Sequence, residues 1–183
     1  MSAGGARSLE ERLALRLPGL ARALRAAGIR WLKPGSRLRR RLVDHILRLR
    51  YEALNRRDYD SLLEGATVEF ELHTARDAAG GPVGMDLEPV YTGRAGFERF
   101  MQRWLDAWED YRIELVEIVD RGDRFLALLR HRGRGRGSGV ELDQPLAQLF
   151  SLVDGRLTRI DNFWDWDSAV EAVGGDRARG RRT

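Results

Sequence analysis

Four long strand-like runs follow one another in the second half of this 183-residue chain, and they constrain its fold more than any other feature. They span residues 113–120, 124–136, 140–152 and 157–164, and Asp154-Gly155 makes a turn into the last of them. Helical patterns lie before these runs rather than between them. A strand meander that follows segregated helices indicates an α+β domain, so we expect a curved antiparallel sheet that wraps over its helices as a cone.

The segments between residues 36 and 111 supply those helices and one further strand. Residues 37–57 form the most regular helical pattern, capped by Ser36, with an apolar stripe of Leu38, Leu42, Ile46, Leu49 and Ala53. Residues 59–64 predict a short helix, residues 67–74 a strand and residues 78–84 a glycine-rich loop. The next helix begins at Thr92 and presents one aromatic face: Phe97, Met101, Trp104 and Trp108. A short helix at 168–173 ends the domain.

The first 36 residues differ in charge from the middle of the chain. Residues 1–50 hold thirteen Lys and Arg against three Asp and Glu, whereas residues 51–175 hold fifteen against twenty-four. Ser8 and Glu11 form a capping box, and leucines recur at helical spacing from residue 9 to residue 24, with Pro18 interrupting them. We therefore expect residues 1–36 to be a basic helical extension folded back on an acidic domain, 37–174. Residues 175–183 read as a disordered Arg-rich tail.

The same leucine-rich extension also has the composition of a helix that lies on a membrane surface, with Trp31 as an interfacial anchor. Because Pro18 breaks the long amphipathic face, we favour packing on the domain over contact with a membrane.

One hairpin can be registered from the sequence. Gly137-Ser138 suits a two-residue turn. That turn sets two opposite-charge pairs across the strands: Arg134 with Glu141, and Arg132 with Asp143. The glycines between the arginines then share the other face with His131. Charge pairing explains this Arg-Gly alternation better than a phosphate-binding loop, because no helix follows it.

Composition excludes several kinds of site. The chain has no cysteine, and its three histidines lack metal-ligand spacing, so we expect neither a metal nor a cofactor. The acidic central domain argues against nucleic acid as its ligand. No apolar run reaches the roughly 18 residues of a membrane span, and no signal peptide follows Met1, so we expect a cytoplasmic protein.

Four short stretches carry a family resemblance. Residues 51–58 (YEALNRRD) are similar to the end of the first helix in SnoaL-like proteins, and residues 91–97 (YTGRAGF) to the entry into their third helix. Residues 154–160 (DGRLTRI) and 163–165 (FWD) resemble their final strand. The resemblance to this SnoaL-like, or nuclear-transport-factor-2-like, superfamily covers about residues 37–174.

The resemblance implies a deep apolar pocket between the helices and the sheet. We interpret the chain as a domain that binds a small apolar or amphipathic metabolite there, and as a homodimer. The expected apolar contacts are Met101, Trp104, Trp108 and Trp164, and the expected polar contacts are Arg130, Gln148 and Asn162.

Two alternatives stay open. The first is a cofactor-independent isomerase, polyketide cyclase or dehydratase, with His131 or Asp161 as general base and Tyr91 as oxyanion donor. The second is a non-catalytic interaction domain that dimerises through its outer sheet.

One activity within the superfamily is not expected. The limonene-epoxide hydrolase pattern has an acidic residue immediately before the aromatic pair of the final strand, where this chain has Asn162. Asp161 lies one step earlier and therefore on the opposite face of a regular strand. That hydrolase also places an aspartate two residues after an arginine, whereas Arg130 is followed by Arg132. We predict no epoxide hydrolase activity.

Overall fold

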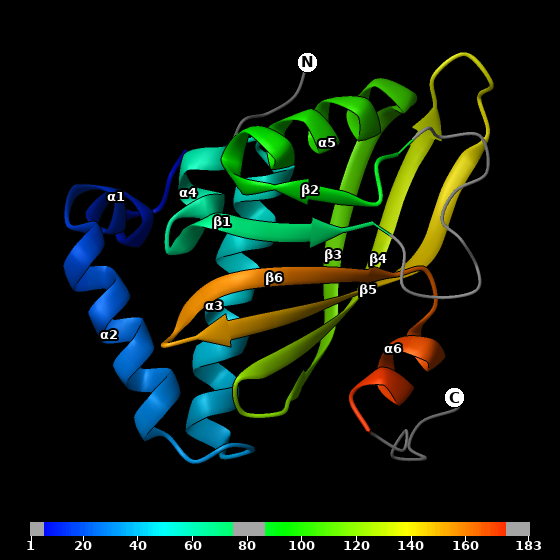
Figure 1. The fold of residues 1–183 in the computed structure, drawn as a ribbon. Coiled ribbons are helices and arrows are strands. Elements are labelled where there is room, and N and C mark those ends of the chain that lie inside the picture. The colour runs from blue at the N-terminus through cyan, green and yellow to red at the C-terminus, as the bar shows by residue number, and fades with distance from the viewer. Residues whose placement is uncertain (1–5, 75–86, 175–183) are drawn as a thin grey trace.

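The computed structural model describes residues 6–74 and 87–174, and their strands form one curved sheet (Figure 1). The strands are β1 (Ala66–His73), β2 (Val90–Thr92), β3 (Trp108–Asp120), β4 (Arg124–Gly135), β5 (Glu141–Val153) and β6 (Arg156–Phe163). Their order across the sheet is β2-β1-β6-β5-β4-β3. The β3 to β6 meander is antiparallel, as predicted, but β1 pairs with β6 in parallel. The predicted α+β cone is thus confirmed, but its sheet is mixed and not entirely antiparallel.

Helices cover both faces of this sheet. On the concave face lie α3 (Arg37–Asn55), α4 (Tyr59–Leu63) and α5 (Gly93–Ala107). On the convex face lies α6 (Trp166–Ala172), where Val170 packs near Leu126 and Leu149. The indole Nε1 of Trp166 donates to the carbonyls of Leu129 and Leu146, each at 3.0 Å, and fixes α6 to the sheet. Alternate residues of β4 and β5 are therefore buried on opposite faces.

The buried face of α3 agrees only in part with the predicted stripe, of which Ala53 is fully buried and Ile46 lines a cavity. Leu38 is exposed, and the residues buried against the sheet are Val43, Leu47 and Tyr51. Leu42, from the predicted stripe, lies against Gly28 of the neighbouring helix α2 (Pro18–Trp31). Helix α3 packs against the sheet on one side and against α2 on another, so its sequence has two apolar stripes. The predicted stripe lies mainly on the side that faces α2.

Trp108 also departs from its prediction. Helix α5 ends at Ala107, and Trp108 is the first residue of β3, paired with Gly135. Its backbone is already extended, with φ −124° and ψ 141°. The indole still packs near Trp104, at 6.0 Å between ring centroids. The four-residue spacing of the two tryptophans therefore spans the junction of α5 and β3 and does not lie within one helix.

The predicted hairpin register is confirmed: Arg134 opposes Glu141 and Arg132 opposes Asp143. The turn itself is longer than two residues, because the last pair is closed by the amide of Gly135, which donates to the carbonyl of Val140 at 2.7 Å. Residues 136–139 form the loop. Two of them, Gly137 and Gly139, have positive φ, which glycine adopts without strain.

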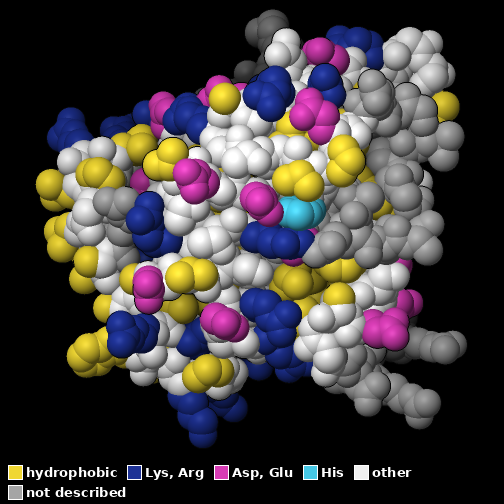
Figure 2. Space-filling view, in the orientation of Figure 1, with side chains coloured by type: hydrophobic (Ala, Val, Ile, Leu, Met, Phe, Trp, Pro, Cys, Tyr) yellow, Lys and Arg dark blue, Asp and Glu magenta, His cyan; other side chains and the backbone are white. Residues whose placement is uncertain are grey.

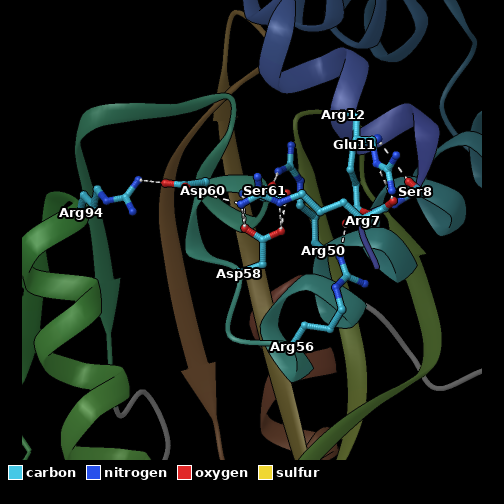
Figure 3. A network of polar contacts seen from close by, with 10 residues as sticks. All are labelled: Arg7, Ser8, Glu11, Arg12, Arg50, Arg56, Asp58, Asp60, Ser61 and Arg94. Carbon is cyan, nitrogen blue, oxygen red and sulfur yellow. Dashed lines mark hydrogen bonds and ion pairs between the residues drawn. The ribbon is translucent and has the colours of Figure 1, made fainter. Parts of the chain in front are cut away.

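The N-terminal segment forms two helices, α1 (Leu9–Arg16) and α2, broken at Pro18, and they lie along α3 and α4 (Figure 1). The predicted capping box of Ser8 and Glu11 is present. Figure 3 shows the polar contacts that hold this end: Arg7 pairs with Asp58, and Arg56 with Glu11. In the same view Arg94 of α5 pairs with Asp60 of α4. The Arg7 guanidinium, with Ser61 also donating, holds the pKa of Asp58 well below its usual range.

The far end of α2 is anchored by one buried arginine. Arg39 pairs with Asp120 at 2.9 Å and donates to the carbonyls of Ile29, Leu32 and Gly122. Both charged side chains are about 4% exposed. A buried pair left without one partner typically costs about 3–5 kcal/mol, so this anchor fixes α2 firmly to the β3–β4 turn.

Two predictions, the loop at 78–84 and the disordered tail at 175–183, lie outside the described residues. Within 6–74 and 87–174, no helix is both long and apolar enough to cross a membrane.

Candidate functional site

A cavity of about 160 Å³ lies between α3, α4, α5 and the concave face of the sheet. Its wall is mostly apolar and includes aromatic side chains from α5 and β5 and the ring of Trp164, which directly follows β6. A cavity of roughly this size, lined by aliphatic and aromatic groups, can hold a molecule the size of benzene. The apolar lining includes Val43, Leu47, Leu54, Phe97, Phe100, Met101, Trp104, Leu146, Phe150, Ile160 and Trp164.

A short chain of polar side chains crosses this apolar wall. The hydroxyl of Tyr51, on α3, donates to Gln148 Oε1 on β5 at 3.0 Å. Gln148 Nε2 in turn donates to Asn162 Oδ1 on β6 at 2.9 Å. Gln148 and Asn162 sit directly opposite each other in the β5–β6 pairing, which places both amides on the concave face.

The polar chain leaves one donor unused. Asn162 Nδ2 has no hydrogen-bond acceptor among the described residues, although the side chain is 2% exposed and lines the cavity. Asn162 Nδ2 is not among the fully enclosed side-chain atoms without a partner, so it keeps accessible surface within the site. An acceptor atom placed in the cavity next to Asn162 would give this amide a hydrogen bond, which contributes about 0.5–1.5 kcal/mol net.

Trp104 is the centre of the aromatic wall. Its ring stacks on Trp164, with centroids 5.4 Å apart, on His131 at 5.9 Å and on Phe100 at 6.1 Å. Tyr111 meets it edge-on at 5.7 Å. Aromatic pairs of this geometry each add about 0.5–1.5 kcal/mol beyond burial, so these contacts stabilise the wall around Trp104.

His131, the first predicted base, is 1% exposed but does not itself line the cavity. It stacks on Trp104, and its Nδ1 lies 3.5 Å from the hydroxyl of Tyr111. Its Nε2 has no partner among the described residues. Burial lowers the pKa of His131 to about 4, so the imidazole is neutral near pH 7. The structure therefore supports an aromatic packing role for it.

The other two predicted catalytic residues also lie away from the cavity. Asp161 is on the opposite face of β6 from Asn162, where it pairs with Arg159 at 2.8 Å. Tyr91 is fully buried beside α5, and its hydroxyl accepts from the amide of Glu88 at 3.0 Å and from Arg103 at 3.4 Å. The structure does not bring Asp161, Tyr91 and His131 together around one space.

The predicted ligand contacts divide into two groups. Met101, Trp104, Gln148, Asn162 and Trp164 all line the cavity. Arg130 and Trp108 do not. Arg130 projects from the outer face of β4 and pairs there with Asp143, because residue 130 alternates with the inward-facing His131. Trp108 packs behind Trp104 at the start of β3.

The sequence reading missed Tyr51 and the charged rim of the cavity. Arg25, Arg50 and Glu64 line that rim, where Arg50 Nη2 lies 2.9 Å from Glu64 Oε2 and Arg25 pairs with the same carboxylate. Tyr51 follows Val43 and Leu47 at four-residue spacing, so the second stripe of α3 contained a signal for it. Arg25 is 39 residues from Glu64, and no local pattern links them.

Helix α2 covers this rim. Arg25 and Ile29 contribute to the cavity wall. Ala26 packs so closely on Gly155 that any side chain at position 155 would collide with Ala26. Gly155 also has φ +71°, a backbone conformation suited to glycine. The β5–β6 turn and α2 therefore meet at the edge of the cavity.

Solved structures show the same fold. TerC, co-crystallised with polyporic acid, is 19% identical, with a TM-score of 0.56 over 72% of this chain and 98% of TerC. An NTF2-like protein of unknown function from Burkholderia pseudomallei is 18% identical, with a TM-score of 0.56 over 71% of this chain and 95% of that protein.

A third structure, from Catenulispora acidiphila, has a ketosteroid isomerase-like fold and holds trimethylamine. It is 15% identical, with a TM-score of 0.53 over 74% of this chain and 97% of that protein. No curated protein matches this chain.

The family model for the SnoaL-like domain matches residues 47–160, which is more than half of the chain. The match begins at Leu47 in α3 and ends at Ile160 in the middle of β6, so it includes most of the cavity wall. This protein belongs to the SnoaL-like domain family.

Proposed function

We propose that this protein binds a small, largely apolar molecule that carries a hydrogen-bond-accepting oxygen, and that it holds this molecule in the α3–α5 cavity. The observation that carries the proposal is the amide nitrogen of Asn162, which has no acceptor among the described residues and lines a mostly apolar wall. Apolar burial would supply most of the affinity, at roughly 25 cal/mol per Å². The amide would orient the ligand, because a buried donor favours molecules that offer it an acceptor.

The shape of the wall narrows the ligand class. Trp104, Trp164 and Phe100 form a stacked aromatic surface, which suits a flat ring better than a branched chain. Two of the similar folds were crystallised with small molecules, polyporic acid and trimethylamine, which supports binding of small molecules by this fold in general.

The acid–base alternative has none of its predicted catalytic residues on the cavity wall, and burial raises the pKa of the two tyrosines that do line it, Tyr51 and Tyr111. None of His131, Asp161 and Tyr91 lines the cavity. Glu64 does reach it, but two arginines pair with that carboxylate. The carboxamide of Asn162 can donate a hydrogen bond but cannot deliver a proton near neutral pH. These positions favour binding over proton transfer.

A matched pair of probes tests the proposal. 1-Indanone is a flat bicyclic ketone, and indane has the same carbon skeleton without the oxygen. Tryptophan fluorescence titration should show that the wild-type protein binds both, with the ketone preferred by roughly threefold to tenfold, as one hydrogen bond predicts. Asn162→Leu should bind the two probes with equal affinity.

The control for this experiment is the adjacent residue. Asp161→Asn changes the same strand on its other face and should keep the ketone preference. Failure of either probe to bind, or a ketone preference that survives in Asn162→Leu, would overturn the proposal.

A further inference from the structure

The leucines of the N-terminal helices face solvent rather than the domain. Leu9, Leu13, Leu17, Leu20 and Leu24 are each between 54% and 76% exposed, and Trp31 is 85% exposed. The helices pack on α3 and α4 through other residues, such as Ala14 and Ile29. The packing predicted for this segment is present, but it does not use the leucine stripe. A row of large apolar side chains is left exposed, and such a surface marks an interaction site.

Basic side chains surround this apolar row. Arg12, Arg16, Arg30 and Lys33 are all exposed, and Arg16, Arg30 and Lys33 have no ion-pair partner among the described residues. The one exposed carboxylate of α1 and α2, Glu10, is paired with His45. Figure 2 shows hydrophobic side chains with Lys and Arg among them at the left edge, where α1 and α2 lie in Figure 1.

These two features together fit one occupant. Leucine and tryptophan side chains enter the boundary between lipid headgroups and acyl chains, while neighbouring arginines pair with anionic headgroups. A second copy of the same face would bring arginine against arginine, and like charges at an interface disfavour association. Charge complementarity therefore favours an anionic lipid surface over self-association.

We propose that the outer face of α1 and α2, formed by the five leucines, Trp31 and their basic neighbours, docks this protein on anionic lipid bilayers. The helices lie in the interface and do not span it. Their inner face remains attached to the domain, because Arg39 holds the end of α2 and Arg7 holds the start of α1. Docking thus needs no unfolding of the cone.

Co-sedimentation of the full chain with vesicles tests this. The protein should bind vesicles that contain phosphatidylglycerol, bind phosphatidylcholine vesicles more weakly, and lose affinity as salt is added, because exposed charges are screened. Leu20→Asp and Leu24→Asp should each weaken binding by about tenfold or more, since each removes one buried leucine and adds a repelled charge. Both positions are exposed, so neither change disturbs the core.

The matched control is Val140→Asp, an exposed apolar position on the β4–β5 hairpin, which should bind as the wild type does. A second readout is Trp31 itself: its emission should shift to the blue on binding, and the shift should be lost in Trp31→Phe.

Three results would overturn the proposal. These are no binding to phosphatidylglycerol vesicles, equal binding by Leu24→Asp, and a dimer in vesicle-free solution that Leu24→Asp dissociates. The last result would show that the outer face of α1 and α2 is a dimer interface. Leu24→Asp should still bind 1-indanone, so the cavity proposal and the lipid proposal can fail independently.

Discussion

The β4–β5 hairpin shows two polar environments separated by one residue of sequence. On its inner face His131 is buried and stacks on Trp104, and Gln148 lines the cavity and accepts a hydrogen bond from Tyr51. On its outer face Arg130, Arg132 and Asp143 form ion pairs with side chains that are nearly half exposed. Strand alternation determines which face each side chain lies on. Exposure to solvent then determines how much each contact contributes to the stability of the fold. Equivalent substitutions should therefore have unequal effects on the two faces.

The largest difference should come from the aromatic wall. Trp104→Ala removes a 2%-exposed ring that stacks on Trp164 and His131, and we expect it to lower the free energy of unfolding by about 3–5 kcal/mol. Val116→Ala, at a half-exposed position on β3, should change it by no more than about 0.5 kcal/mol. Urea unfolding measures both. Similar values for the two variants would contradict the contrast between the faces.

The next largest effect should be a loss of stability in acid that depends on His131. Its pKa is about 4 when folded, because burial disfavours the cation, and near 6.5 when unfolded. The unfolded chain therefore binds the proton first. Above pH 6.5 His131 is neutral in both states and does not lower the free energy of unfolding. As the pH falls from 6.5 toward 4, protonation of His131 in the unfolded chain lowers the free energy of unfolding by roughly 3 kcal/mol.

His131→Phe tests this assignment, since a phenyl ring keeps the stack on Trp104 and cannot be protonated. Urea unfolding at pH 7 and pH 4.5 should show a clearly smaller pH effect in this variant than in the wild type. An unchanged pH dependence would assign the acid sensitivity to other groups.

A smaller effect should follow from the polar chain in the cavity. Tyr51→Phe removes the hydroxyl that donates to Gln148 Oε1 and leaves that oxygen without its partner. We expect a loss of about 1–3 kcal/mol in unfolding free energy and a weaker ketone preference, because Gln148 no longer holds Asn162 in place. A loss of stability with an unaltered ketone preference would show that the chain does not orient Asn162.

The smallest effect should be on the outer face. Asp143→Asn removes the partner of Arg130 and Arg132, but both pairs are open to solvent and are screened by salt. We expect a change in the unfolding midpoint near the limit of measurement, and none in probe binding. A loss as large as that of Tyr51→Phe would mean that these pairs do more than support the hairpin register.

The sequence allowed prediction of β1, of the β3 to β6 meander and of the hairpin register, because these depend on local alternation and turn residues, but it missed the three-residue strand β2. It also separated Asn162 from Asp161 by strand parity, although it could not tell which of them faced the cavity. It failed where two surfaces compete for one element: α3 has two apolar stripes, and α2 covers the one that was chosen.

The candidate site was only half predictable for a related reason. Trp104 and Gln148 lie on elements whose inward face could be inferred, whereas Asn162 was predicted as a contact while the inward face of its strand stayed open. Arg130 was assigned to the cavity although it alternates with His131, and the rim formed by Arg25 and Glu64 depends on a contact between distant segments. Such contacts arise from tertiary packing and leave no periodic signal in the sequence.

The most direct test of ligand binding at Asn162 is the side-chain amide spectrum of ¹⁵N-labelled protein titrated with 1-indanone. The Asn162 signals can be identified by their loss in Asn162→Leu. We predict that the ketone shifts the amide signals of Asn162 and Gln148 together, and that indane shifts them less. If 1-indanone binds while both amide signals stay in place, the ligand lies elsewhere and the account of the cavity is wrong.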